Sequence, residues 1–118
     1  MKSKILLIGI DGLNLDTALE NAPTLVALKE KGFFTPITIE PPTWSGPSWS
    51  TLLTGTKHSQ HGVIDNSFTG HKLLHHPDLL SQAFYQDQST TTFAAAGWPP
   101  LVDPIGHGPV IHERREQA

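Results

Sequence analysis

A continuous apolar run near the N-terminus, residues 5–10, restricts the fold of this chain more than any other feature. The run is rich in β-branched residues, which is typical of a strand that is buried on both faces. Asp11 and Gly12 follow it directly and predict the turn by which the chain leaves this strand. A strand that is covered on both sides indicates a parallel sheet with helices packed against it.

Three other segments have the patterns of short helices. Pro23 suits the first turn of a helix and Gly32 suits its C-terminal cap. Ser45 or Ser48 is expected to cap the N-terminus of a later helix. The three predicted helices cover residues 23–32, 49–54 and 77–86.

Two further strands are predicted, at residues 33–39 and 90–96, so that strands and short helices alternate. This order favours parallel βαβ units and an α/β fold. Residues 56–76 are polar and rich in Gly and His, which indicates a loop. We expect one domain over residues 1–118, in which residues 101–118 form an irregular polar tail.

Composition excludes several classes of function. The chain has 118 residues, a net charge of −3 and no cysteine, so it has neither a basic surface for a nucleic-acid polymer nor a thiolate metal site. No segment is long and apolar enough to span a bilayer. The first apolar run is too short for the core of a signal peptide, and no small-residue cleavage site follows it. We therefore expect a cytoplasmic protein.

Asp11 and Ser45 are the first candidate site residues. Asp11 lies at the C-terminal end of the predicted first strand, where open α/β sheets bind ligands, although an Asp-Gly pair is also a common turn. Ser45 is either a helix cap or a nucleophile at a helix N-terminus, where backbone N–H groups favour phosphate. A serine hydroxyl needs a base or a metal to become reactive, and no histidine lies within a few residues. Activation by a metal is the simpler hypothesis.

Four blocks of sequence, in this order and spacing, resemble the N-terminal portion of the type I phosphodiesterase/nucleotide pyrophosphatase family. That family belongs to the alkaline phosphatase-like superfamily. The resemblance covers roughly residues 4–98, and four ordered blocks are far more specific than any single one. The blocks are residues 8–12, residues 23–25 with Gly32, residues 42–55 and residues 61–66.

The resemblance implies an α/β fold of the three-layer sandwich type, present in part, with a mostly parallel sheet. It also implies a hydrolase with two zinc ions that acts on a phosphate ester or a nucleotide-like small molecule. Asp11 matches a metal-ligand aspartate, and Ser45 matches the nucleophile, which also binds metal and becomes a seryl-phosphate. Asn66 matches the asparagine that holds the phosphoryl oxygens; without the resemblance we would interpret it as a loop residue.

The chain departs from the family pattern at two places. Trp44, Gly46 and Ser48 stand where many relatives carry a lysine before the nucleophile and bulkier residues after it, which leaves the nucleotide preference open. Most zinc ligands of the family lie further downstream. Asp103 and His107 have one of the expected spacings, but they follow the third predicted strand too closely, and we favour coincidence.

Two alternatives to an active phosphodiesterase stay open. In the first, the chain is a catalytically inactive fragment of such an enzyme, which lacks most of the zinc ligands. In the second, Ser48 is the nucleophile of a metal-independent esterase. Residues 46–50 approach the G-x-S-x-G nucleophile elbow, but serine replaces the last glycine.

Overall fold

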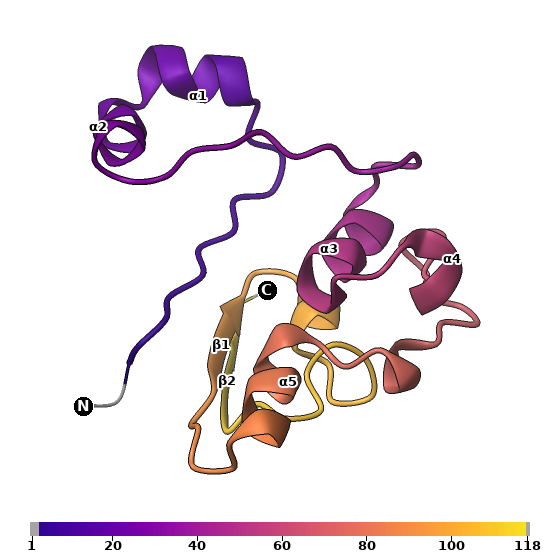
Figure 1. Ribbon diagram of the computed structural model, residues 1–118. Helices are drawn as coiled ribbons and strands as arrows, with labels where there is room; N and C mark the ends of the chain where they lie inside the picture. The colour runs from indigo at the N-terminus through magenta and orange to yellow at the C-terminus, as the bar shows by residue number, and fades with distance from the viewer. Residues whose placement is uncertain (1–2, 118) are drawn as a thin grey trace. The chain divides into compact units, whose positions relative to one another are not determined.

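The structure is a computed structural model that describes residues 3–117 (Figure 1). Its contacts divide the chain into two compact units, Met1–Thr38 and Ile39–Ala118. In the part of the chain that the structure describes, no helix has the length and apolar character needed to cross a membrane.

The first unit contains two short helices, α1 (Leu15–Asn21) and α2 (Pro23–Lys31). The side chain of Asn14 caps α1 by accepting a hydrogen bond of 3.0 Å from the backbone N–H of Thr17, which satisfies one of the donors that a helix start leaves open. Pro23 occupies the first position of α2, where its missing N–H costs nothing. The predicted helix over residues 23–32 is confirmed, whereas α1 was not predicted.

The predicted buried strand at residues 5–10 is wrong for this structure. Its large apolar side chains are between 56 % and 93 % exposed, and residues 5–10 form no backbone–backbone hydrogen bond with any described residue. A strand exists only where a neighbouring strand pairs with its N–H and C=O groups. No described segment does so here, and the run is extended but unpaired.

The predicted strand at residues 33–39 is also absent among the described residues, because no neighbouring strand pairs with it. These residues are extended without a partner strand, and the side chains of Phe33 and Ile37 are largely exposed. Pro36 within this segment has no backbone N–H to give to a ladder. The Phe34 ring lies under the ammonium group of Lys29, at 4.6 Å from the ring centroid, in a cation–π contact.

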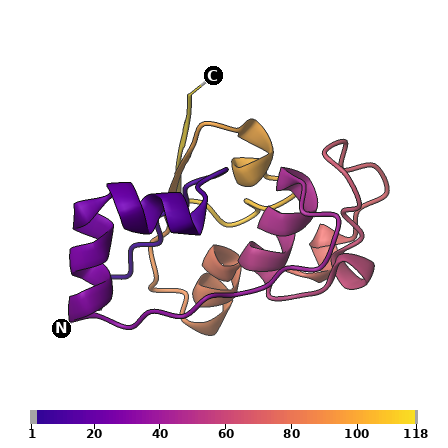
Figure 2. The same cartoon turned by 90° about the horizontal axis from the view of Figure 1, so that it is seen from above.

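In the second unit, residues 39–117 contain three α-helices and two short 3₁₀ turns. Figures 1 and 2 show α3 and α4 side by side, and the two helices contact each other. The buried carboxylate of Asp78 caps α5 by accepting hydrogen bonds from the backbone N–H groups of Leu80 and Ser81. The predicted helices near 49–54 and 77–86 are therefore confirmed, with shifted ends. The elements are α3 (Ser45–Thr54), α4 (His58–His61), η1 (Leu73–His75), α5 (Leu79–Gln86) and η2 (Pro99–Val102).

The second unit also contains a small parallel sheet, β1 (Phe93–Ala96) with β2 (Glu113–Glu116), in which Phe93 is paired with Glu113. The predicted strand at 90–96 is thus present in shorter form. The segment 101–118, expected to be an irregular polar tail, contains β2 and the last two residues of η2. Periodicity could not reveal β2, since its sequence is Glu-Arg-Arg-Glu and its partner alone makes it a strand.

The core of the second unit combines few apolar side chains with buried polar ones. Val63, Leu73, Val102 and Ile111 are its buried large apolar residues. All four lie in segments predicted to be loop or tail. The segment 56–76, predicted as loop, in fact includes α4 and η1.

Substitution of Gly108 tests how tightly this core is packed. A Cβ at residue 108 would lie 2.5 Å from Cδ1 of Ile111 and 2.8 Å from the carbonyl oxygen of Val102. We expect Gly108→Ala to lower the free energy of unfolding by about 1–3 kcal/mol, because overpacking forces neighbouring groups apart. Urea denaturation measures the change. Gly97→Ala is the control, since the nearest atom to its Cβ is 3.9 Å away. Equal stability of the two variants would contradict this account of the core.

Candidate active site

The first turn of α3 carries the candidate nucleophile. The helix begins at Ser45, and its N-cap residue is Trp44, whose side chain makes no capping hydrogen bond. The expectation that Ser45 or Ser48 caps this helix is therefore wrong. Ser45 is the first helical residue and is half-buried, so its hydroxyl lies at the positive end of the helix dipole.

Asn66 caps α3 from a distant loop. Its Oδ1 accepts a hydrogen bond of 2.7 Å from the backbone N–H of Gly46, which is 20 positions earlier in the sequence. Because a backbone N–H can only donate, this contact fixes which end of the Asn66 amide is the oxygen. The structure thus brings the predicted residue Asn66 to the turn that starts with Ser45.

Gly46 permits this approach because it has no side chain. A Cβ at residue 46 would lie 2.6 Å from the carbonyl oxygen of Asp65 and 3.0 Å from Oδ1 of Asn66. The loop itself is held by Asp65, whose Oδ1 accepts hydrogen bonds from the backbone N–H and the hydroxyl of Ser67. These bonds stabilise the carboxylate and lower the pKa of Asp65.

A buried serine and histidine pair lies further along α3. The hydroxyl of Ser50 donates to the carbonyl oxygen of Gly46 at 2.7 Å and contacts Nε2 of His107 at 2.9 Å. Both side chains are essentially inaccessible to solvent. Burial is the main cause that lowers the pKa of His107 to about 4, and the nearby His61 and His71 add to it. His107 is therefore neutral at pH 7.

A second histidine holds the neighbouring residue of α3. Nδ1 of His61 accepts a hydrogen bond of 3.0 Å from the backbone N–H of Val63, so its Nε2 carries the proton and donates to the hydroxyl of Thr51 at 3.0 Å. Burial, together with His58 and His76, lowers the pKa of His61 to about 4. The two histidines together anchor α3 to the rest of the unit.

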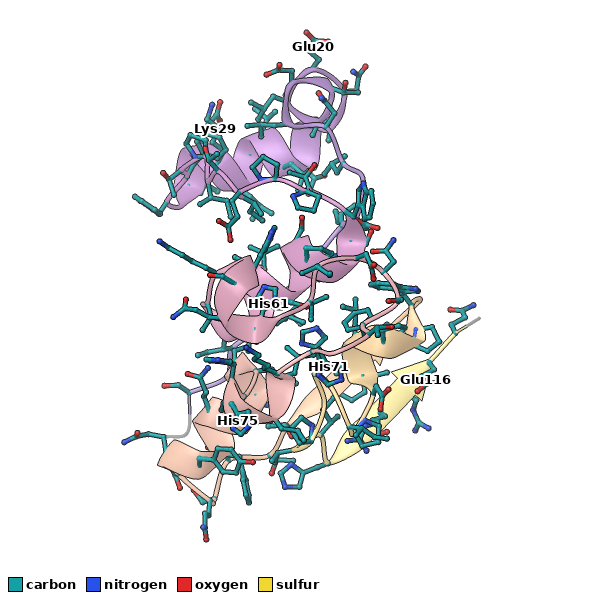
Figure 3. All side chains as sticks on the ribbon, turned by 90° about the vertical axis from the view of Figure 1, so that its right-hand side faces the viewer. Glu20, Lys29, His61, His71, His75 and Glu116 are labelled. Carbon is teal, nitrogen blue, oxygen red and sulfur yellow. The ribbon has the colours of Figure 1, made fainter. Side chains whose placement is uncertain are left out.

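The other histidines do not form a metal site. Figure 3 shows His61, His71 and His75 on neighbouring segments of the second unit. Across residues 3–117, no three or more Cys, His, Asp and Glu side chains gather closely enough to hold a metal ion. Asp103 uses its Oδ1 to accept from the backbone N–H of Ile105, and His107 contacts Ser50. Both members of the metal-like spacing thus take part in hydrogen bonds within the protein.

Asp11, the predicted metal ligand, belongs to the first unit and is exposed, directly before the positive-φ residue Gly12. Ser45 and Asn66 belong to the second unit, where the structure brings them together. The Ser48 hydroxyl is buried and has no hydrogen-bond partner among the described residues. Ser48 consequently lacks the adjacent base that an esterase nucleophile requires.

Ser45 thus starts a helix whose first turn is capped by an asparagine from a distant loop. The class is an α/β protein, with helices and a small parallel sheet. A family model described as type I phosphodiesterase / nucleotide pyrophosphatase matches residues 5–113, so the chain belongs to this family. Its helices and parallel strand pair are consistent with part of the alkaline phosphatase-like fold. No curated protein matches the chain, and no solved structure matches it.

Sequence reasoning missed three residues of this arrangement. Gly46 was considered as a departure from relatives and as the start of an incomplete nucleophile elbow, whereas its lack of a side chain is what admits Asn66. Ser50 and His107 are 57 positions apart, and nothing local connects them. His107 was considered only for its metal-like spacing from Asp103, and burial was not predicted in this segment.

The buried histidines predict a loss of stability in acid. The unfolded chain binds these protons near pH 6.5, whereas folded His61 and His107 bind them only near pH 4. Their contribution to stability is complete above pH 6.5 and is lost progressively as the pH decreases towards 4. Burial raises the pKa of Asp78, which acts in the opposite direction. Urea denaturation at pH 7 and pH 4.5 measures the difference.

The control for this prediction is the exposed His75, because His75→Gln should leave the pH dependence of the unfolding free energy unchanged. His61→Gln should reduce that dependence by the contribution of one proton. An unfolding free energy that is the same at pH 7 and pH 4.5 would contradict the prediction.

Proposed function

We propose that this chain hydrolyses a phosphate ester or anhydride through a seryl-phosphate intermediate, with Ser45 as nucleophile and Asn66 as a substrate-binding residue. The observation that carries the proposal is the 2.7 Å hydrogen bond from the backbone N–H of Gly46 to Oδ1 of Asn66. It sets an amide side chain beside the residue that follows the nucleophile. Membership of the phosphodiesterase family provides the reaction type in its general form.

The reaction has two steps. The oxygen of the Ser45 hydroxyl forms a bond to phosphorus, the bond from phosphorus to the leaving oxygen breaks, and the hydroxyl proton is released. Water then attacks the seryl-phosphate, which releases phosphate or a phosphomonoester and restores the serine. The N-terminus of α3 favours the negative charge that develops on the phosphoryl oxygens. With its Oδ1 already engaged, Asn66 retains two N–H donors on Nδ2 for such oxygens.

The proposal includes a requirement for zinc. Asp11 provides a carboxylate, which is a common zinc ligand, and the resemblance to the family assigns a metal-binding role to the Ser45 oxygen as well. The described residues contain no larger group of side chains that could hold a metal ion, so these residues do not complete a zinc site and no step above is assigned to the metal. A bound zinc ion would lower the pKa of the nucleophilic hydroxyl.

The substrate in this proposal is a small phosphate ester or a nucleotide-like molecule. Trp44 is 58 % exposed directly before the nucleophile, where many relatives have lysine. An exposed indole there adds no positive charge, so the site relies on the helix N-terminus and on Asn66 for its attraction to phosphate.

Replacement of the nucleophile tests the proposal. We expect Ser45→Ala to lower the rate of hydrolysis of bis(4-nitrophenyl) phosphate by about 10³-fold or more, because the covalent step needs the hydroxyl. Ser48→Ala is the matched control in the same helix: its hydroxyl has no hydrogen-bond partner among the described residues, and its loss should change the rate by less than about threefold. Release of nitrophenolate measures both rates.

The same assay tests the metal. Addition of zinc should raise the rate of the wild-type chain and a chelator should lower it. Equal rates for wild type and Ser45→Ala would remove Ser45 from the mechanism. Hydrolysis that is insensitive to the chelator would overturn the proposal of a metal requirement. Binding of inorganic phosphate without any turnover would favour the inactive alternative.

A further inference from the structure

The buried pair of Ser50 and His107 has no place in the chemistry described so far. We propose that His107 is a positioning residue, which acts through Ser50 to hold the first turn of α3 in the geometry that presents Ser45 to phosphate. This inference rests on the proposed function of Ser45. The inference concerns the two hydrogen bonds made by the backbone of Gly46, and these can be measured without any turnover.

The donors and acceptors in the hydrogen bonds of Ser50 and His107 can be assigned by counting the available protons. The single hydroxyl proton of Ser50 can go either to the carbonyl oxygen of Gly46, at 2.7 Å, or to Nε2 of His107, at 2.9 Å. In the second case Nε2 of His107 is the acceptor, so the proton of the neutral imidazole lies on Nδ1, which is buried and has no partner among the described residues. The short contact between the Ser50 hydroxyl oxygen and the carbonyl oxygen of Gly46 would then have no proton between the two atoms. Buried donors without partners are rarer than buried acceptors without partners. We therefore assign the proton of His107 to Nε2.

The resulting chain of donors ends on Gly46. Nε2–H of His107 donates to the hydroxyl of Ser50, which donates to the carbonyl oxygen of Gly46. The N–H of Gly46 in turn donates to Oδ1 of Asn66. Both peptide groups that flank the α-carbon of Gly46 are thus held by side chains.

This restraint matters because Gly46 is intrinsically the most flexible residue of the turn. Glycine loses more conformational freedom on ordering than any other residue, and Pro47 has no N–H with which to secure the next peptide group. Rotation about the bonds of Gly46 would move Ser45 relative to the body of α3. Fixing the two flanking peptide groups therefore fixes the position of the nucleophile.

His107 also connects this helix with the loop that carries Asn66. Its ring packs edge-on against the ring of Phe68, at 5.9 Å between centroids. Phe68 lies two positions after Asn66, in the same loop. The same imidazole thus contacts both sides of the candidate site, through Ser50 on α3 and through Phe68 on the loop.

The pair is not a second catalytic site. Ser50 has no exposed surface and His107 is 1 % exposed, so a substrate does not reach either group. A nucleophile and its base need such access. Ser50 and His107 therefore stabilise the first turn of α3 and do not form a separate reaction centre.

The test compares two replacements of His107 in the full chain. His107→Leu removes the donor to Ser50, whereas His107→Gln offers an amide N–H in its place. Ser50→Ala removes the link to Gly46, and His75→Gln is the control for a histidine replacement at an exposed position. The backbone amide signal of Gly46 and the side-chain amide signals of Asn66, measured by nuclear magnetic resonance, report the geometry directly. Titration with inorganic phosphate and the kcat and KM for bis(4-nitrophenyl) phosphate report its consequence.

We expect His107→Leu and Ser50→Ala to shift the Gly46 and Asn66 signals and to lower kcat about 10- to 100-fold, because small misplacements of a reacting group have effects of this size. KM should change by less than about threefold. His107→Gln should recover most of the loss, and the double variant His107→Leu/Ser50→Ala should lose no more than either single variant. His75→Gln should match wild type in every measurement.

Several results would overturn the inference. A folded His107→Leu variant with wild-type Gly46 signals and full kcat would do so, as would a loss in His107→Leu that simply adds to the loss in Ser50→Ala. If His107→Leu does not fold, the comparison of His107→Gln and Ser50→Ala decides in the same way. If the wild-type chain shows no turnover, the proposed function fails, and the Gly46 signals with the phosphate affinity still decide the role of His107.

Discussion

The first turn of α3 is organised around the backbone of Gly46, whose N–H is bound by a side chain from a distant loop and whose C=O is bound by a side chain from the next turn of the helix. Asn66 reaches the N–H only because residue 46 has no Cβ. Ser50 reaches the C=O from one turn further along α3, supported by His107. The first turn of this helix therefore owes its conformation to partners that lie outside it, and the candidate nucleophile depends on the same contacts.

Neutral buried histidines take the place of apolar side chains in this small unit. His61 and His107 each hold a hydroxyl group of α3, and burial lowers the pKa of both to about 4. A buried polar network of this kind stabilises a particular arrangement only while its members keep their protonation state. The unit thereby obtains a defined geometry near neutral pH at the expense of stability in acid.

The first unit shows how far local sequence rules extend. The pattern of Pro23 and Gly32 predicted α2 correctly, because capping and propensity act within a few residues. The apolar runs at residues 5–10 and 33–39 predicted strands, but the described chain offers them no partner strand. The β2 strand is the reverse case: its charged sequence predicts nothing, yet pairing with β1 makes it a strand. Strand formation is a property of two segments, and one pattern cannot establish it.

Four ordered blocks of sequence, two of them around Ser45 and Asn66, were enough to identify the family, which the match over residues 5–113 confirms. Helices α2, α3 and α5 also followed from local signals. The contacts that shape the candidate site did not, since Asn66 is 20 positions from Gly46 and His107 is 57 positions from Ser50. Hydrogen-bond partners at such separations are selected by packing and by the need to satisfy buried polar groups. Those conditions exist only once the chain has folded.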